Sequence, residues 1–234
     1  MHLFYDPNIT TDTKSFILNE EESGHACRVL RMRVGNSLFL LDGKGNRYTC
    51  VISDPHPKKC QVDVTSVFTE IDKEPEIHLA IAPTKNMERI EWLTEKITEL
   101  GVTQITLLLC RNNERKQVKL ERLQRILVSA MKQSQRLFLP ILNDLTPLNT
   151  FVSENPNGLI AHCHEGNKST LQELIADNQG PLLIGPEGDF TREEVELALQ
   201  NGYKSITLGK NRLRTETAGL LVCAAAVLNK TVQE

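Results

Sequence analysis

Two short apolar segments in the second half of the chain each end at a glycine-containing loop that leads into a helical segment. Residues 182–188 read LLIGPEG, which predicts a buried strand followed by a tight turn. Residues 205–209 read SITLG, and a basic loop then leads to a helix that starts at Thr215 or Thr217. Open α/β sheets bind ligands beyond the carboxyl ends of such strands. We therefore expect the two loops to form two walls of one ligand pocket.

The length and composition of the chain fit a cytosolic protein. Its 234 residues can hold one large domain, or one small and one medium domain. No apolar run reaches the roughly 18 residues needed to span a bilayer. The first residues, MHLFYD, lack the basic and apolar regions of a signal peptide. We expect a cytoplasmic protein without membrane segments.

The six cysteines are scattered and form no C-x-x-C pair, so we expect reduced thiols rather than a disulfide framework or a zinc knuckle. The only cluster that could suggest a metal is His162-Cys163-His164. If these residues lie on a strand, the two imidazoles share one face and the thiol points to the other. A closed zinc site needs about four ligands, so we expect no metal here.

Residues 1 to about 70 have the pattern of a small β-barrel. Three β-prone runs, at 37–41, 48–53 and 60–68, are separated by turn signals. One short helix is expected around residues 20–32, with three arginines near its end: Arg28, Arg31 and Arg33. A charged, proline-ended segment at residues 70–75 reads as a linker.

From residue 76 onward, strands and helices alternate, which predicts a mostly parallel sheet covered on both faces. Asn86 is expected to cap a helix that Gly101 ends, and Thr191 with Glu194 forms a capping box for a later helix. The remaining predictions are strands at 77–82, 105–109, 159–163, 182–184 and 205–208, and helices at 119–137, 169–176, 191–201 and 215–229.

The loops indicate a cofactor pocket. A Rossmann or P-loop phosphate site is not expected, because neither G-x-G-x-x-G nor G-x-x-x-x-G-K-[ST] occurs. Loop backbone groups could read an adenine edge, while Ile184, Leu208 and Leu213 cover its faces. Glu187 or Glu216 could offset a positive ligand, or could simply stabilise a helix N-terminus. No nucleophile motif is present, so the chemistry is expected to be carried by a cofactor.

Charge is distributed unevenly along this chain, whose net charge is −3. Residues 111–136 contain eight Lys or Arg and only two acids. This local excess could contact a phosphate backbone, or it could be a solvated helix face.

Four motifs together resemble one known family. They are Lys96-x-x-Glu99-Leu100-Gly101-Val102, Gln133-Ser134-x-Arg136 before Pro140, the Ile184–Gly188 segment, and Leu213-Arg214-Thr215-Glu216-Thr217-Ala218. In this order, and with Arg28-Val29-Leu30-Arg31 before Gly35, they resemble the RsmE family of bacterial 16S ribosomal RNA (uracil-N3)-methyltransferases in the SPOUT superfamily. The resemblance spans nearly the whole chain.

The resemblance implies a PUA-like RNA-binding β-barrel at residues 1–70 and an α/β SPOUT methyltransferase domain with a C-terminal trefoil knot at residues 75–234. It also implies S-adenosyl-L-methionine as methyl donor, a homodimer, and 16S rRNA of the small ribosomal subunit as partner. The cofactor-binding residues are then His164, Ile184, Gly185, Glu187, Gly188, Leu208, Gly209, Leu213, Thr215 and Ala218. The RNA-binding residues are Arg28, Arg31, Arg33, Lys85, Arg111 and Arg136.

Three positions depart from the family pattern. Asp189 stands where the family usually has a second glycine. The segment 210–213 replaces a loop that more often begins Pro-Arg, and residues 111–115 lack the serines usual there.

The expected reaction is methylation of N3 of a uridine, with Arg214 stabilising negative charge on the uracil carbonyls and Glu216 orienting groups or accepting a proton. These two residues could instead form only an ion pair. Two alternatives stay open: a non-catalytic RNA-binding or ribosome-assembly factor, supported by Asp189, and a methyltransferase acting on another RNA base.

Overall fold

The computed structural model describes residues 2–71 and 76–231, which divide into two compact units. Among these residues, unit 1 comprises 2–71 with 131–139, and unit 2 comprises 76–130 with 140–231. The expected linker at 70–75 lies mostly outside the described residues.

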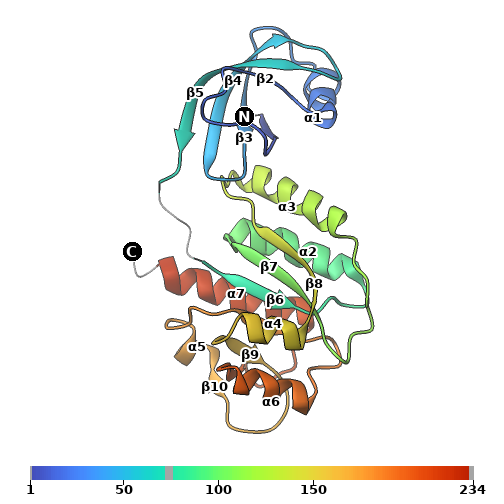
Figure 1. The fold of residues 1–234 in the computed structure, drawn as a ribbon, viewed down its shortest axis with the longest axis vertical. Helices are drawn as coiled ribbons and strands as arrows, with labels where there is room; N and C mark the ends of the chain where they lie inside the picture. The colour runs from blue at the N-terminus through green and yellow to red at the C-terminus, as the bar shows by residue number, and fades with distance from the viewer. Residues whose placement is uncertain (1, 72–75, 232–234) are drawn as a thin grey trace. The chain divides into compact units, whose positions relative to one another are not determined.

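Unit 1 contains a mixed five-stranded sheet with strand order β1-β3-β4-β5-β2 (Figure 1). Alternate residues of the central strands, such as Leu38, Leu40 and Tyr48, are buried in one core with Phe4 and Ala26. The three strands expected here are therefore confirmed. The elements of the unit are β1 (Leu3–Tyr5), β2 (Ser15–Ile17), α1 (Glu20–Gly24), the π-helix η1 (His25–Val29), β3 (Ser37–Leu41), β4 (Asn46–Asp54) and β5 (Gln61–Thr69).

The helix expected at residues 20–32 is shorter and less regular than predicted. Its α-helical part ends at Gly24, and the π-turn that follows ends at Val29. Arg31 adopts a φ of 53°, in the left-handed region, and this conformation stops a right-handed helix. Consequently Arg31 and Arg33 lie in the loop before β3, and only Arg28 is helical.

Unit 2 contains a seven-stranded parallel sheet with the order β10-β12-β9-β11-β6-β7-β8. Its strands are β6 (His78–Ile81), β7 (Gln104–Leu109), β8 (Ile141–Pro147), β9 (Leu159–Ala161), β10 (Ser169–Thr170), β11 (Leu182–Ile184) and β12 (Lys204–Thr207). Its helices are α2 (Met87–Leu100), α3 (Leu120–Ser134), whose last turn belongs to unit 1, α4 (Leu148–Glu154), α5 (Leu171–Leu174), α6 (Arg192–Gln200) and α7 (Thr215–Thr231).

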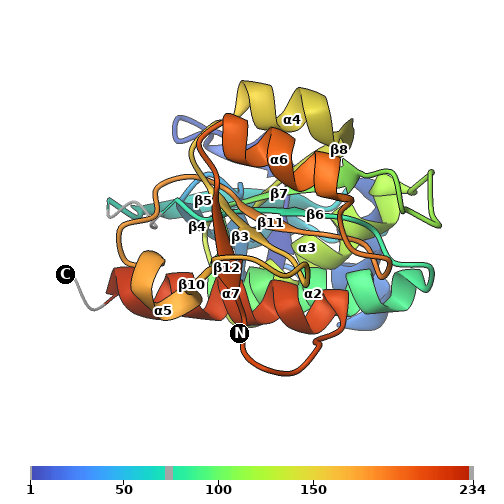
Figure 2. The ribbon, with the colours of Figure 1, turned by 90° about the horizontal axis from the view of Figure 1, so that it is seen from below.

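Helices cover both faces of this sheet, as the strand–helix alternation predicted. Figure 2 shows α4 and α6 on one face, and α2, α5 and α7 on the other. On the first face, Phe151 of α4 and Ala198 of α6 pack against Leu183 and Ile160 of the central strands. On the second face, Gly219 of α7 lets the helix approach so closely that an added Cβ would lie 2.9 Å from Leu93 Cδ2.

The helix boundaries follow from local sequence signals. The Asn86 side chain accepts a hydrogen bond from Glu88 N at the start of α2, and Gly101 ends that helix with a φ of 96°. Thr191 and Glu194 form the expected capping box at α6, and α7 begins at Thr215. Within residues 2–71 and 76–231, no helix is long and apolar enough to cross a bilayer.

Candidate functional site

The candidate site lies at the edge of the unit 2 sheet where its parallel strands end. Strands β12, β9, β11 and β6 are consecutive in the sheet, so their carboxyl ends lie side by side. The loops that follow these strands begin at residues 208, 162, 185 and 82. This edge therefore gathers both loops singled out from the sequence.

A hydrogen bond joins the start of α7 to the Gly-Pro-Glu-Gly turn. Thr215 Oγ1 donates to the carbonyl of Gly185 over 3.3 Å, and this contact is buried. Ala218 N donates to the carbonyl of Arg214, so Arg214 stands at the cap position of the helix. The expected closeness of the two loops is confirmed, whereas their role in ligand binding stays a prediction.

The loop glycines have different surroundings. Gly209 has a φ of 123°, which only glycine adopts readily, and an added Cβ would meet no atom within 4 Å. At Gly185, an added Cβ would lie 3.0 Å from the Phe190 ring, and at Gly188 it would lie 3.1 Å from Asn112 Cβ. At Gly185 and Gly188 the neighbouring atoms belong to the protein's own side chains, whereas Gly209 borders open space.

Asp189 supplies the backbone conformation that a glycine would otherwise provide. Its φ is 63°, in the left-handed region that Asp tolerates better than most residues. Its Oδ1 accepts a hydrogen bond from Phe190 N at 2.9 Å, and its Oδ2 accepts one from Cys163 N at 2.7 Å. The carboxylate thus ties the loop after β11 to the loop after β9.

The loop after β9 is held by further contacts. His164 Nε2 donates to the carbonyl of Phe190 over 2.6 Å, and Lys168 Nζ donates to the carbonyls of His162 and His164. Strand β9 ends at Ala161, two residues earlier than predicted, so the His-Cys-His cluster lies in the loop and not on a strand. The two imidazole rings are nevertheless 5.6 Å apart.

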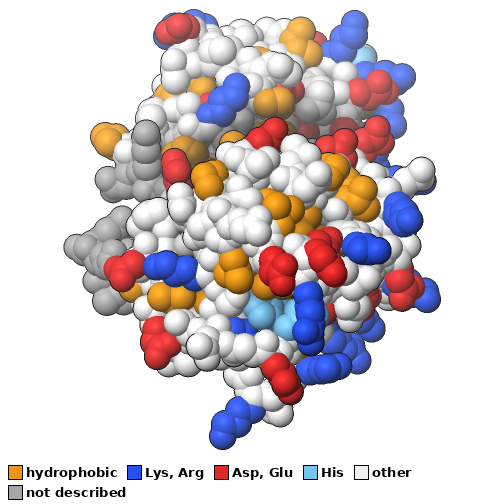
Figure 3. All heavy atoms as spheres, turned by 60° about the horizontal axis from the view of Figure 1, so that its bottom comes forward, with side chains coloured by type: hydrophobic (Ala, Val, Ile, Leu, Met, Phe, Trp, Pro, Cys, Tyr) orange, Lys and Arg blue, Asp and Glu red, His pale blue; other side chains and the backbone are white. Residues whose placement is uncertain are grey.

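The surroundings of His162 favour the neutral form of its imidazole. Burial and the nearby Lys168 lower the pKa of its imidazole, with Asp189 acting in the opposite direction. Its Nε2 lies 2.9 Å from Ser205 Oγ, while its buried Nδ1 has no partner among the described residues. In the space-filling view of Figure 3, histidine side chains reach the surface beside both acidic and basic side chains.

Glu216, in the first turn of α7, is a buried carboxylate with an incomplete set of partners. Only 8% of the residue is exposed, its Oε1 lies 3.7 Å from Arg89 Nε, and its Oε2 has no hydrogen bond within the described part of the chain. The ion pair considered between Glu216 and Arg214 is therefore absent from the described residues, where Arg89 of α2 takes that place. Arg89 was missed because nothing in the sequence links residue 89 to residue 216.

Glu187 is engaged with the loop after β6. Its carboxylate accepts the backbone N–H of Lys85 at 3.1 and 3.3 Å. The Lys85 ammonium lies 2.9 Å from Glu114 Oε2, and this hydrogen bond raises the pKa of Lys85. Arg115 donates to the carbonyl of Lys85 over 2.6 Å. The three loops after β6, β7 and β11 are thus connected to one another.

The six arginine and lysine residues expected to bind RNA fall into both units. Arg28, Arg31 and Arg33 are exposed in unit 1, which also contains the half-buried Arg136. Lys85 and Arg111 are exposed in unit 2, where Arg111 N donates to Glu194 Oε1. Two other members of the basic stretch are paired internally, Arg122 with Glu91 and Lys132 with Glu22.

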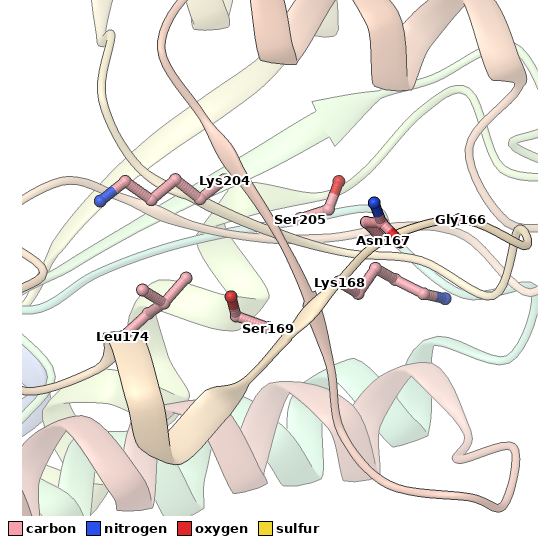
Figure 4. Close-up of a pocket in the computed structure, with 7 residues that line it drawn as sticks. All are labelled: Gly166, Asn167, Lys168, Ser169, Leu174, Lys204 and Ser205. Carbon is pink, nitrogen blue, oxygen red and sulfur yellow. The ribbon is translucent and has the colours of Figure 1, made fainter.

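A hollow of about 590 Å³ lies beside strands β10 and β12 (Figure 4). It is lined by Gly166, Asn167, Lys168, Ser169, Leu174, Lys204 and Ser205. Lys204 and Ser205 begin β12, so the hollow borders the start of that strand and not its carboxyl end. None of the residues predicted to bind the cofactor lines it.

Two family models match the chain. The model for the RNA methyltransferase domain matches residues 72–227, and the model for the RNA methyltransferase PUA domain matches residues 18–65. Together with the parallel sheet and its loop cluster, these matches define the class: an RNA methyltransferase with a PUA domain.

Individual relatives narrow the class. The ribosomal RNA small subunit methyltransferase E of Synechocystis is 32% identical over 84% of this chain and 67% of its own length. The structure of a probable rRNA-methyltransferase from Porphyromonas gingivalis is 36% identical, covers both chains fully and has a TM-score of 0.89. That of a ribosomal RNA small subunit methyltransferase E from Neisseria gonorrhoeae, bound to S-adenosyl methionine, is 27% identical over 96% of each chain, with a TM-score of 0.82. The chain belongs to the ribosomal RNA small subunit methyltransferase E (RsmE) family.

Proposed function

We propose that this protein transfers a methyl group from S-adenosyl-L-methionine to N3 of a uridine in 16S rRNA of the small ribosomal subunit. The observation that carries the proposal is the loop cluster at the carboxyl edge of the sheet, in a chain similar over almost its full length to a methyltransferase E bound to S-adenosyl methionine. Family membership supports the reaction type, and the open space at Gly209 supports the place of the cofactor.

The residues at this edge fit the cofactor. Leu208 is half-buried and Leu213 is 39% exposed, so these two apolar side chains are available to an adenine, whereas Ile184 is buried. The unpartnered Oε2 of Glu216 is a buried acceptor that suits a cationic or hydrogen-bonding ligand group. When bound, S-adenosylmethionine supplies an electrophilic methyl group. The residues that would hold it are His164, Ile184, Gly185, Glu187, Gly188, Leu208, Gly209, Leu213, Thr215 and Ala218.

Arg214 is proposed to stabilise the reacting uracil. The imide nitrogen must lose its proton as the new N–C bond forms, which places negative charge on the flanking carbonyls. Arg214 is exposed, and its guanidinium has no hydrogen-bond or ion-pair partner within residues 2–71 and 76–231. It is thus available to a substrate and carries the charge that this step requires.

Glu216 is proposed to orient groups at the site or to accept the N3 proton. Its Oε1 faces Arg89, and its Oε2 has no partner in the described structure. A carboxylate held on one side by an arginine keeps a defined orientation, and its second oxygen, although buried, has no hydrogen bond among the described residues. Because N3 lies on the pairing edge of uracil, the target base must be unpaired or flipped out. Flanking phosphates would be held by Arg28, Arg31, Arg33, Lys85, Arg111 and Arg136.

Asp189 does not indicate a degenerate pocket. It adopts a left-handed backbone conformation, which glycine also permits, and its carboxylate connects two site loops. The only feature that supported a non-catalytic assembly factor therefore also fits an ordered pocket. The trefoil knot, the homodimer, the division at residues 70–75 and the cytoplasmic location stay part of the proposal. The insertion of β11 between β9 and β6 is compatible with the knot, and the exposed Leu221 and Leu228 of α7 are available to a second subunit.

The test uses the Arg214→Ala variant with Arg212→Ala as the matched control, since both arginines are exposed in the same loop. We expect Arg214→Ala to lose turnover on unmodified small-subunit RNA, with S-adenosylmethionine affinity in calorimetric titration largely unchanged. Arg212→Ala should keep more of both. Mass spectrometry of nucleosides would identify the product. A product other than 3-methyluridine would refute the proposed base, and no methyl transfer by folded wild-type protein would refute the proposed activity.

A further inference from the structure

Two phenylalanine rings and one arginine form a cluster on the unit 1 sheet, hereafter the Phe-Arg-Phe cluster. Arg47 of β4 places its guanidinium carbon 5.3 Å from the ring centre of Phe39 and 5.2 Å from that of Phe68. Phe39 lies on β3 and Phe68 on β5, the two neighbours of β4 in the sheet (Figure 1). Phe68 is 51% exposed, although a large aromatic side chain gains from burial.

The cluster lies on the sheet face opposite the larger core of unit 1. The same face also carries Leu41, which pairs with Arg47 and is buried with Met131 and Leu137 in a second cluster. Arg47 pairs directly with Phe68, and the adjacent residue Tyr48, which points to the other face, is fully buried in the core. In the next cross-strand row, Phe39 pairs with Thr49, and Thr49 pairs with Ser66. The open part of this face therefore presents aromatic, guanidinium and hydroxyl groups, without a carboxylate in these two rows.

Arg47 keeps its hydrogen-bonding capacity for a ligand. Within the described residues its guanidinium forms two ring contacts, but none of its N–H groups has a hydrogen-bond acceptor or an acidic partner. A guanidinium carries five donors, which suit phosphate oxygens and the acceptor edges of bases. Its contact with both rings limits its rotamers.

We propose that the Phe-Arg-Phe cluster binds an unpaired nucleobase of RNA by stacking on Phe68, with Arg47 bonding the base edge or the adjoining phosphate. Exposed aromatic rings on a sheet, accompanied by arginine, are the groups on which single-stranded RNA stacks. The cluster is distinct from Arg28, Arg31 and Arg33, which are expected to contact phosphates alone. The inference rests on the proposed function only in taking RNA as the substrate.

The chemistry of the face favours RNA over a protein partner. One row holds Arg47 and Phe68 beside the buried Leu41, and the next row holds the half-buried Phe39 beside Thr49 and Ser66. Within the cluster only Phe68 is more than half exposed, so the face offers little apolar area to a protein. An unpaired base needs an exposed ring and a nearby cation, and these are supplied by Phe68, which is 51% exposed, and by Arg47, whose guanidinium carbon lies 5.2 Å from the ring centre. The uridine proposed as target must be unpaired, so single-stranded nucleotides would be available near it.

The test measures binding of a fluorescein-labelled oligouridylate to the full-length chain by fluorescence anisotropy. Phe68→Leu keeps an apolar side chain but removes the ring, and Phe68→Tyr keeps the ring. Val67→Ala is the matched control, because Val67 is 37% exposed on the same strand but pairs with core-facing Tyr48. We expect about fivefold weaker binding by Phe68→Leu, equivalent to about 1 kcal/mol. Phe68→Tyr and Val67→Ala should bind like the wild type.

Salt dependence and base fluorescence distinguish stacking from charge. Phe68→Leu should weaken binding at every salt concentration without changing the salt slope, whereas Arg28→Ala should reduce the slope. A 2-aminopurine placed in the oligonucleotide should be quenched by the wild type and by Phe68→Tyr, but less by Phe68→Leu. If Phe68→Leu does not fold, Arg47→Lys gives the same test, since it keeps the charge and loses the planar group.

The proposal is overturned if wild-type protein does not bind the oligonucleotide, or if Phe68→Leu binds and quenches like the wild type. S-adenosylmethionine affinity, measured on the same variants, should be unchanged. Failure of the wild type to bind S-adenosylmethionine would count against the proposed function alone, because the stacking test depends only on RNA affinity.

Discussion

Replacement of Asp189 by alanine removes two hydrogen bonds at once and leaves alanine at a φ of 63°. The bond from Cys163 N, at 2.7 Å, is the one that joins the loops after β9 and β11. Without it, the loop after β9 keeps the contacts of His164 and Lys168 but loses the hydrogen bond from Cys163 N to the Asp189 carboxylate. We expect the loop to be less ordered before the cofactor binds.

The size of the effect follows from the bond type and the exposure. A hydrogen bond to a charged group contributes about 1.5–3 kcal/mol, and the half-buried position of Asp189 places it at the lower end. If the cofactor must then order the loop, its affinity falls by about 1.5 kcal/mol, which is roughly tenfold. Alanine at a left-handed position costs about 1 kcal/mol more than glycine, and this cost affects stability rather than binding.

Three variants separate these contributions. Asp189→Ala and Asp189→Gly should both bind S-adenosylmethionine about tenfold more weakly in calorimetric titration, but Asp189→Gly should unfold at the higher temperature. Asp189→Asn keeps a neutral acceptor and tolerates the left-handed conformation, so its affinity should fall only a few fold.

Equal cofactor affinity in the wild type and in Asp189→Gly would refute the argument. It would mean that the remaining contacts of the loop after β9 suffice to position it. An Asp189→Ala variant as stable as Asp189→Gly would separately contradict the conformational cost.

Three further predictions concern the interior of unit 2. Burial lowers the pKa of His78 to about 4, against 6.5 in the unfolded chain, so between these pH values only the unfolded chain binds the proton. The free energy of unfolding should therefore decrease by about 3 kcal/mol as the pH falls from 6.5 to 4. Urea unfolding of His78→Gln should lack this pH-dependent decrease. Gly219→Val should lower the free energy of unfolding by about 1–3 kcal/mol, because its Cβ would overlap α2 side chains, and unchanged stability would show that the helices can separate without cost. Arg89→Gln should lower the free energy of unfolding by about 1 kcal/mol, because it leaves the Glu216 carboxylate buried and unpaired. The double variant Arg89→Gln/Glu216→Gln should recover part of this loss in thermal unfolding.

Local sequence signals were sufficient for much of the fold. The alternation of residues in β3 and β4, the Asn86 cap and the Thr191–Glu194 capping box depend on neighbours in the chain, and each appears as expected. Two strands near the N-terminus and the segment β8–α4 were missed, and the helix predicted at 169–176 is the short α5, preceded by strand β10 at residues 169–170. Strands β1 and β2 have only three residues each, too few to show a period, and they are defined by pairing with distant β3 and β5.

The candidate site could be predicted only in part, because its contacts connect residues far apart in the chain. The closeness of the two loops, which the Gly185–Thr215 hydrogen bond confirms, was anticipated from the strand ends alone. The pairing of Glu216 with Arg89, and of Asp189 with Cys163 N, depends on the strand order, which periodicity does not reveal. The Phe-Arg-Phe cluster depends on cross-strand register in the same way.

The position of β11 in the sheet also determines when the protein can be completed during synthesis. This strand fills the space between β9 and β6, yet β6 leaves the ribosome about a hundred residues earlier. Until β11 arrives, the nascent chain presents an apolar strand with one unpaired edge, which can pair with another chain. Helix α7, which Arg214 caps, follows still later in the chain. A chain that stops before α7 therefore lacks the helix that packs against β6.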